Sequence, residues 1–145
     1  MKRVYPREEV CIGCHLCEIA CIVEHSASKD IIKAFKTEAL KPTARNLVEE
    51  EGPVSFSVSC RHCNEPPCVQ ACISGAMVKD YQSGVVCHLE EKCMGCWSCI
   101  MACPYGVIRK NPVRKTVIKC DLCPERPIPA CVEACPNRAL IFEER

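Results

Sequence analysis

Aromatic residues are scarce in this sequence, long apolar runs are missing, and neither sign of charge dominates. One Trp, three Tyr and three Phe account for 5% of the 145 residues, and the formal net charge is only +1. No apolar stretch approaches the roughly 20 residues that a membrane-spanning helix needs. We therefore expect no direct membrane span, no nucleic-acid partner held by a basic surface, and only a small apolar core.

The start of the sequence also shows no secretory signal. Residues 1–9 read MKRVYPREE, without the apolar segment that follows the basic residues of a signal peptide. The sequence therefore predicts a cytoplasmic location. Disulfide bonds are rare in such a reducing compartment.

Cysteine is what the sequence has in excess, at 17 of 145 positions. Sixteen of them fall into four groups of four, and Cys87 is left over. The first and third groups are spaced C-x2-C-x2-C-x3-C, the second C-x2-C-x4-C-x3-C and the fourth C-x2-C-x7-C-x3-C. The groups are Cys11, Cys14, Cys17 and Cys21; Cys60, Cys63, Cys68 and Cys72; Cys93, Cys96, Cys99 and Cys103; and Cys120, Cys123, Cys131 and Cys135.

This spacing suits iron–sulfur ligation. Cysteines at i, i+3 and i+6 let one loop reach three irons of a cubane cluster, and Gly13 and Gly95 let backbone amides turn toward the sulfides. We expect the fourth cysteine to begin a helix that points away, so that it binds the other cluster of a two-cluster unit. Pro104 and Pro136 directly follow the fourth cysteine of groups three and four and suit the first turn of such a helix.

Other cysteine chemistries fit the pattern less well. Disulfides need an oxidising compartment and usually an even number of cysteines. Structural zinc uses paired C-x2-C knuckles, and radical chemistry on S-adenosylmethionine uses C-x3-C-x2-C, which no group contains. The sequence therefore predicts four [4Fe–4S] clusters. Because each cluster with its four thiolates carries about −2, the oxidised holoprotein would have a net charge of about −7.

The cysteine groups form an internal repeat with short elements between them. We expect short helices after the last cysteine of each group. We also expect short paired strands, at 75–80 with 85–89, 106–110 with 116–119, and 139–142 with 3–5.

Residues 22–59 are a cysteine-free insert in this repeat. Apolar residues at helical spacing predict a helix over 30–39, ended by Pro42, and strands are expected at 47–48 and 54–58. Two interpretations of the insert stay open. It is either a docking element for a partner or a lid that shields a cluster from water.

The segments CRHCNEPPCVQAC and KCDLCPERPIPACVEACP carry a family resemblance. From about Val10 to Phe142, the chain resembles the four-cluster [4Fe–4S] ferredoxin-like subunits of anaerobic oxidoreductases. These are the iron–sulfur subunits related to those of dimethyl sulfoxide reductase and formate dehydrogenase. The chain is shorter than many members of this family, and we expect no C-terminal membrane anchor. In its compactness it is most similar to the electron-transfer subunit of carbon monoxide dehydrogenase.

The resemblance implies an α+β fold of two ferredoxin-like, two-cluster lobes, loop-rich and stapled by metal. Residues 1–21 plus 104–145 would form one lobe, and residues 60–103 the other. Cys96 is present where some relatives have an aromatic residue, so four complete cubanes are expected. The implied ligand sets are nested: Cys11, Cys14, Cys17 and Cys135 (set one); Cys21, Cys120, Cys123 and Cys131 (set two); Cys60, Cys63, Cys68 and Cys103 (set three); and Cys72, Cys93, Cys96 and Cys99 (set four).

The resemblance also implies a function: an electron-transfer (polyferredoxin) subunit, not itself an enzyme, that relays single electrons between a catalytic oxidoreductase and a second redox partner. The sequence shows no nucleotide-binding glycine loop or flavin motif of its own. The expected partners are carbon monoxide dehydrogenase, then a hydrogenase, formate dehydrogenase or tungsten aldehyde oxidoreductase, then a flavin-dependent NAD(P)H oxidoreductase. Two alternatives are a free, diffusible ferredoxin that serves several enzymes and a zinc-stapled scaffold without redox work.

Residues outside the ligand sets receive plainer expectations. We expect Cys87 to be a small buried residue in a strand, and Trp97 to pack against a cluster. The four histidines should lie beside the clusters or on the surface, and residues 49–51, three glutamates, should form a solvated loop.

Overall fold

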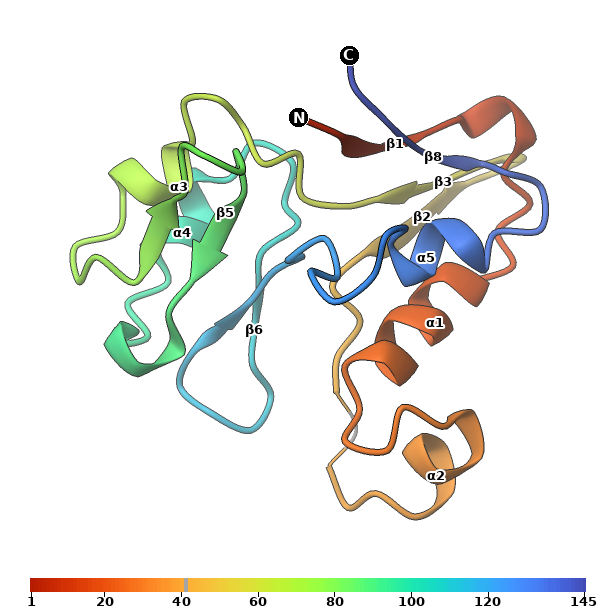
Figure 1. Ribbon diagram of the computed structural model, residues 1–145, viewed down its shortest axis with the longest axis horizontal. Coiled ribbons are helices and arrows are strands. Elements are labelled where there is room, and N and C mark those ends of the chain that lie inside the picture. The colour runs from red at the N-terminus through yellow and green to blue at the C-terminus, as the bar shows by residue number, and fades with distance from the viewer. Residues whose placement is uncertain (41) are drawn as a thin grey trace.

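Short helices and two-stranded hairpins alternate along the chain, in an α+β fold that the computed structural model describes over residues 1–40 and 42–145 (Figure 1). The helices are α1 (Leu16–Glu24), α2 (Ile31–Lys36), α3 (Pro67–Gln70), α4 (Ser98–Ala102) and α5 (Ala130–Glu133), with 3-10 turns η1 (Glu8–Val10) and η2 (Glu90–Lys92). The strands are β1 (Arg3–Pro6), β2 (Leu47–Glu51), β3 (Val54–Val58), β4 (Met77–Lys79), β5 (Val86–His88), β6 (Arg109–Lys110), β7 (Val117–Ile118) and β8 (Leu140–Glu143).

The strands pair as the sequence predicts, in antiparallel sheets of two strands each. Strand β1 pairs with β8, so that Arg3 faces Glu143 and the two chain ends lie near each other (Figure 1). The hairpins β4–β5 and β6–β7 confirm the two strand pairs expected between the cysteine groups, although β6 and β7 are only two residues long. These short pairs connect loops and contribute little core of their own.

The helices begin one cysteine earlier in each group than expected. In α1, α3, α4 and α5 alike, the third cysteine of the group is the second residue of the helix, as Cys17 is in α1. The fourth cysteine follows one turn later, inside α1 in group one and just beyond the helix end in the other three groups. The prediction that helices follow the fourth cysteine is therefore wrong. One helical turn between the third and fourth cysteines is enough to carry the two sulfurs about 6 Å apart along the helix axis.

The prolines after the fourth cysteine accordingly end helices instead of starting them. Pro104 and Pro136 lie in turns that follow α4 and α5. A proline at this place cannot continue the helix. Ile22 stands at the same position in group one, and there α1 continues to Glu24. The absence of proline is not sufficient for continuation, because α3 also ends before its group's fourth cysteine, which is followed by Ile73.

The insert divides into two structural parts. Its helix α2 begins where expected, since the Asp30 carboxylate accepts hydrogen bonds from the N–H groups of Ile32 and Lys33. It ends at Lys36, well before Pro42, and just beyond its end the Glu38 side chain accepts a hydrogen bond from the N–H of Ser28 (2.9 Å). Lys41, within the insert, lies outside the described residues.

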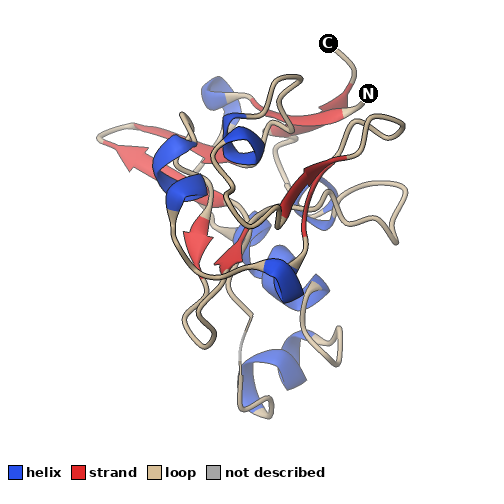
Figure 2. Cartoon of the chain, turned by 90° about the vertical axis from the view of Figure 1, so that its left-hand side faces the viewer, coloured by secondary structure: helices blue, strands red, loops and turns tan. Residues whose placement is uncertain are grey.

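Helix α2 lies far from the chain termini in both views (Figures 1 and 2). The second part of the insert, the β2–β3 hairpin, lies instead beside the first cysteine group. The Ser55 hydroxyl donates to the carbonyl of Cys11 (3.3 Å), and the Ser57 Oγ lies 3.5 Å from the Cys17 Sγ.

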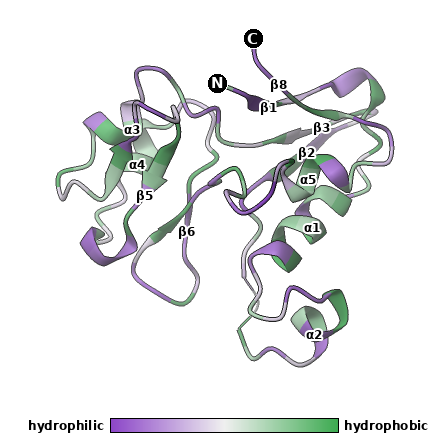
Figure 3. Ribbon diagram, viewed as in Figure 1, coloured by the Kyte–Doolittle hydropathy of each residue, from purple (hydrophilic) through white to green (hydrophobic). Residues whose placement is uncertain are grey.

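Two hydrophobic clusters form the core, and cysteine is part of each. The first contains Val4, Cys17, Val48, Leu122, Cys131 and Leu140. The second contains Cys68, Met77, Val86, Cys99, Ile108 and Val117. Apolar colour is correspondingly spread along α1 and the hairpins and is not gathered in one layer (Figure 3). The sequence also predicts two lobes, and that division stays a prediction.

Candidate metal centres

The loops of groups one and three have the same local geometry. A 3-10 turn precedes each loop, and its first carbonyl accepts from the N–H of the first cysteine, at 3.3 Å for Cys11 and 3.1 Å for Cys93. Inside each loop a glycine takes a left-handed conformation, with φ of +63° at Gly13 and +68° at Gly95. A left-handed residue also precedes each helix, namely His15 and Trp97. The repeated cysteine spacing therefore corresponds to a repeated backbone path.

A second repeated turn follows the fourth cysteine of groups two, three and four. The third residue after it is left-handed in each case, with φ of +68° at Gly75, +62° at Gly106 and +51° at Arg138. The N–H of each of these residues donates to the carbonyl of its fourth cysteine at 3.3 Å. Arg138 shows that this turn does not require glycine, so the glycines alone do not reveal it in the sequence.

Cysteines of set one meet although they are far apart in the sequence. Cys11, Cys14 and Cys17 line one small apolar cavity together with Cys135, which follows α5. Contact between α1 and α5 holds these segments side by side (Figure 1).

Cysteines of set two surround Cys131. Burial raises the pKa of the Cys131 thiol, and the nearby Cys120, Cys21 and Cys123, together with Cys17 of set one, raise it further by repulsion between thiolates. The positive charge of bound iron would offset that repulsion.

Sets three and four show the same proximity. Burial raises the pKa of Cys68 to about 11, and the neighbouring Cys60 and Cys103 contribute in the same direction. Burial also raises the pKa of Cys99, with repulsion from three neighbours: Cys72, Cys93 and Cys96. The structure thus brings together cysteines that the nested assignment groups, while the ligand sets themselves stay a prediction.

Backbone amides point at cysteine sulfurs in several places. The N–H of Ala139 donates to the Cys135 Sγ (3.1 Å), that of Arg45 to the Cys21 Sγ (3.2 Å) and that of Met77 to the Cys72 Sγ (3.4 Å). Amide–sulfur bonds of this kind are among the factors that set the potential of an iron–sulfur cluster. The donor set of the chain, free thiols with backbone amides aimed at several of their sulfurs, fits [4Fe–4S] clusters.

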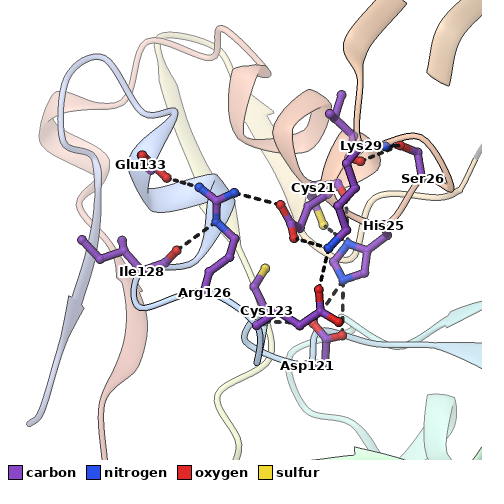
Figure 4. Close-up of polar contacts among 12 residues, drawn as sticks. Cys21, His25, Ser26, Lys29, Asp121, Cys123, Arg126, Ile128 and Glu133 are labelled. Atoms are coloured by element: carbon purple, nitrogen blue, oxygen red, sulfur yellow. Dashed lines mark hydrogen bonds and ion pairs between the residues drawn. The ribbon is translucent and has the colours of Figure 1, made fainter. Parts of the chain in front are cut away.

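A polar cluster lies beside set two, around Asp121 (Figure 4). The Arg45 Nη1 donates to the Asp121 carboxylate (2.5 Å), and the His25 Nε2 lies 3.2 Å from it. Burial lowers the pKa of His25, but its bonds to Asp121 and Cys21 outweigh that effect and raise it to about 10. The ligand atoms of His25, Asp121 and Cys123 lie within 4.8 Å of one another. The histidine thus supports a ligand loop, as expected, whereas nothing in the sequence pattern marked Asp121.

Two smaller expectations need correction. Cys87 lies in β5 as predicted, but it is exposed and not buried. Alternation along the strand explains this, because Val86 faces the core and the next side chain faces outward. The glutamates at 49–51 are exposed, as expected, but they lie in strand β2 and not in a loop.

Trp97 packs against the second hydrophobic cluster, under the Lys110 ammonium at 4.8 Å.

Sequence comparison matches two iron–sulfur families to this chain. The 4Fe-4S dicluster domain family matches residues 54–145, and a 4Fe-4S binding domain matches residues 8–22. An iron–sulfur protein of Rhodospirillum rubrum is 37% identical over 153 residues, covering 94% of this chain and 79% of that protein. The electron transport protein HydN of Escherichia coli (strain K12) is 38% identical over 151 residues, covering 93% and 83%.

Two further comparisons are less complete. Protein NrfC of Escherichia coli (strain K12) is 39% identical over 144 residues, and the match spans 61% of that protein. A chain of the active site complex BamBC of benzoyl coenzyme A reductase, 21% identical, superposes with a TM-score of 0.56 over 100% of this chain and 78% of its own, which shows a shared fold. In the part of the chain that the structure describes, no helix is long and apolar enough to cross a membrane. The chain belongs to the 4Fe-4S dicluster family of ferredoxin-type electron-transport proteins and binds multiple [4Fe–4S] clusters.

Proposed function

We propose that this chain is a four-cluster electron-transfer subunit that relays single electrons between a catalytic oxidoreductase and a second redox partner. One observation supports the proposal: cysteines from groups that are distant in the sequence lie close together in the structure. Each cluster, when bound, supplies one-electron oxidation and reduction. The chain's own residues hold the iron, direct amides at the sulfurs and restrict access of water.

The nested ligand sets are part of this proposal. Set one would be Cys11, Cys14, Cys17 and Cys135; set two Cys21, Cys120, Cys123 and Cys131; set three Cys60, Cys63, Cys68 and Cys103; and set four Cys72, Cys93, Cys96 and Cys99. Residues 1–21 plus 104–145 would carry the first two sets and residues 60–103 the other two.

Exposure supports an order in which sets one and four are terminal. Cys14 of set one and Cys96 of set four are exposed, whereas every cysteine of sets two and three is buried or half-buried. Thiolate repulsion from Cys60 raises the pKa of Cys120, after the larger effect of burial, so sets two and three are near each other. Redox partners would therefore meet the chain beside Cys14 and beside Cys96.

The partner enzyme is proposed from the resemblance and from relatives that act in electron transport. Carbon monoxide dehydrogenase ranks first, followed by a hydrogenase, formate dehydrogenase or tungsten aldehyde oxidoreductase, with a flavin-dependent NAD(P)H oxidoreductase as a possible second partner. The β2–β3 hairpin would shield set one from water, and α2 would be the part of the insert left for docking.

Metal analysis of anaerobically purified protein tests the proposal. Four cubanes require about 16 irons and about 16 acid-labile sulfides per chain. Electron paramagnetic resonance after reduction should show several interacting cubane signals. A preparation holding chiefly zinc, or only about eight irons after full reconstitution, would refute the four-cluster proposal and favour the scaffold or a smaller ferredoxin.

Size measurement separates a permanent subunit from a diffusible ferredoxin. The native protein from its own cells should co-elute with a larger redox enzyme in anaerobic gel filtration, at high salt as well as low salt. Elution at 16.1 kDa under both conditions would favour the free ferredoxin instead.

A further inference from the structure

Two lysine side chains, Lys119 buried and Lys79 half-buried, lie between cysteines of sets two and three. Lys119 follows β7 and is only 4% exposed. Its Nζ donates to the carbonyls of Val86 (2.5 Å) and Cys120 (2.6 Å). Lys79 ends β4, and its Nζ donates to the carbonyls of His62 (3.1 Å) and Cys63 (2.9 Å). The two ammonium groups therefore come from different hairpins to one junction.

Neither ammonium group has a carboxylate partner. Among the described residues, no Asp or Glu oxygen lies within 4.0 Å of the Nζ of Lys79 or Lys119. Burying a charge without a counter-charge is costly, so an anionic group is needed nearby. Carbonyl oxygens orient the ammonium groups but carry no net charge.

Cysteine thiolates are the anions that this junction offers. Lys119 binds the carbonyl of Cys120, in set two, and Lys79 binds the carbonyl of Cys63, in set three. The charge of Lys119 also acts on Cys68 of set three, and Cys63 and Cys60 favour the charged form of Lys79. The lysines therefore face thiolates of both central sets.

A buried imidazole between the lysines adds no charge. His62 is fully buried, and its Nδ1 accepts the N–H of Val86 (3.0 Å) while its Nε2 has no partner among the described residues. Because the Nδ1 atom accepts a hydrogen bond, it carries no proton, and the imidazole is neutral. The junction therefore keeps the positive charge of the lysines.

We propose that Lys119 and Lys79 are charge-setting residues that raise the reduction potentials of the two central clusters above the value their own ligands would give. This inference rests on the proposed four-cluster function. A fixed positive charge near a cluster favours the reduced state, because reduction adds a negative charge. Raising both potentials together makes it easier for an electron to enter the two central clusters and to pass between set two and set three.

Lys119→Met in the full holoprotein tests this role, because methionine keeps the length of the side chain and removes its charge. The readout is an anaerobic redox titration followed by paramagnetic resonance. Two of the four clusters should become harder to reduce, by about tenfold in the reduced-to-oxidised ratio at fixed potential, which corresponds to about 59 mV for one electron. Lys119→Arg, which keeps the charge, should restore the original potentials.

Lys92→Met is the matched control. Lys92 directly precedes Cys93, as Lys119 precedes Cys120, but it is exposed to solvent. Its removal should leave all four potentials unchanged. If Lys92→Met and Lys119→Met shift the potentials equally, the buried position has no special role and the inference is wrong.

The iron content keeps the outcomes distinct. A wild-type protein without four clusters contradicts the proposed function itself. Four clusters in the wild type, with full iron and unchanged potentials in Lys119→Met, overturn only the role of the lysine. If Lys119→Met loses iron, Lys79→Met provides the second measurement. Loss of iron in both variants shows that the lysines serve cluster insertion and overturns the electrostatic role.

Discussion

Replacing Cys135 with alanine is the most informative single change for the ligand sets. Cys135 lies after α5 and lines a cavity with Cys11, Cys14 and Cys17, which come from the opposite end of the chain. Its sulfur also accepts the N–H of Ala139 (3.1 Å). Because each set supplies four ligands to one cubane, Cys135→Ala should cost one cluster, or about four of about 16 irons.

Double variants identify which cluster is lost. If Cys135 shares a cluster with Cys14, the variant Cys14→Ala/Cys135→Ala loses no more iron than either single variant, about four irons in total. Cys123→Ala/Cys135→Ala removes ligands from two different clusters and should lose about eight. If Cys14→Ala/Cys135→Ala instead loses about eight irons and Cys123→Ala/Cys135→Ala only about four, the fourth cysteine binds the same cluster as its own group.

Iron and acid-labile sulfide counts, together with integrated paramagnetic resonance signals, provide the assay under strictly anaerobic conditions. A cluster that survives as a three-iron species is recognised by its signal in the oxidised protein and is counted as damaged. Cys87→Ala is the matched control, since this cysteine is exposed in β5 and belongs to no set. Loss of a cluster in Cys87→Ala would mean that the sixteen-cysteine assignment is incorrect.

Three further predictions concern stability. Gly95→Ala and Gly106→Ala both place alanine in a left-handed backbone conformation, which costs about 1–2 kcal/mol. A Cβ at Gly95 would also lie 2.5 Å from the carbonyl oxygen of Lys115, whereas a Cβ at Gly106 would have no atom within 4 Å. Gly95→Ala should therefore be worse by about 1–3 kcal/mol in anaerobic denaturation, and equal effects would contradict this. Asp121→Asn should cost about 1–3 kcal/mol, because Arg45 and His25 lose their charged partner. The exposed Glu125→Gln should have a smaller effect. Chelation of iron should abolish the native circular dichroism signal, and a cooperative melt of the apoprotein would refute it.

The repeated elements of this fold are readable from the sequence because local chemistry determines them. The hairpins β4–β5 and β6–β7 follow from alternating apolar residues around turn-forming segments, and they form as expected. The pairing of β1 with β8 was also predictable, since each is a short apolar strand flanking the repeat. What these elements share is a pattern confined to a few neighbouring residues.

Features that depend on tertiary contacts were not readable in the same way. Helix propensity does not reveal that α2 ends at Lys36 or that Glu38, just beyond it, binds Ser28. The exposure of Cys87 depends on which face of β5 meets the core. Lys119 looks in the sequence like any surface lysine, and only the fold shows that it is 4% exposed.

The structure also explains why metal and fold should form together. The helices that carry cysteines are four to nine residues long, which is too short for stability in isolation. Four of the twelve buried residues in the two hydrophobic clusters are cysteines, and burial raises the pKa of each thiol, which disfavours the thiolate form that iron binds. Bringing Cys135 beside Cys17 also closes a large part of the chain into a loop. Iron binding would offset that entropy and the cost of the buried thiolates at once, so the cysteine pairing that defines each cluster would also define the path of the chain.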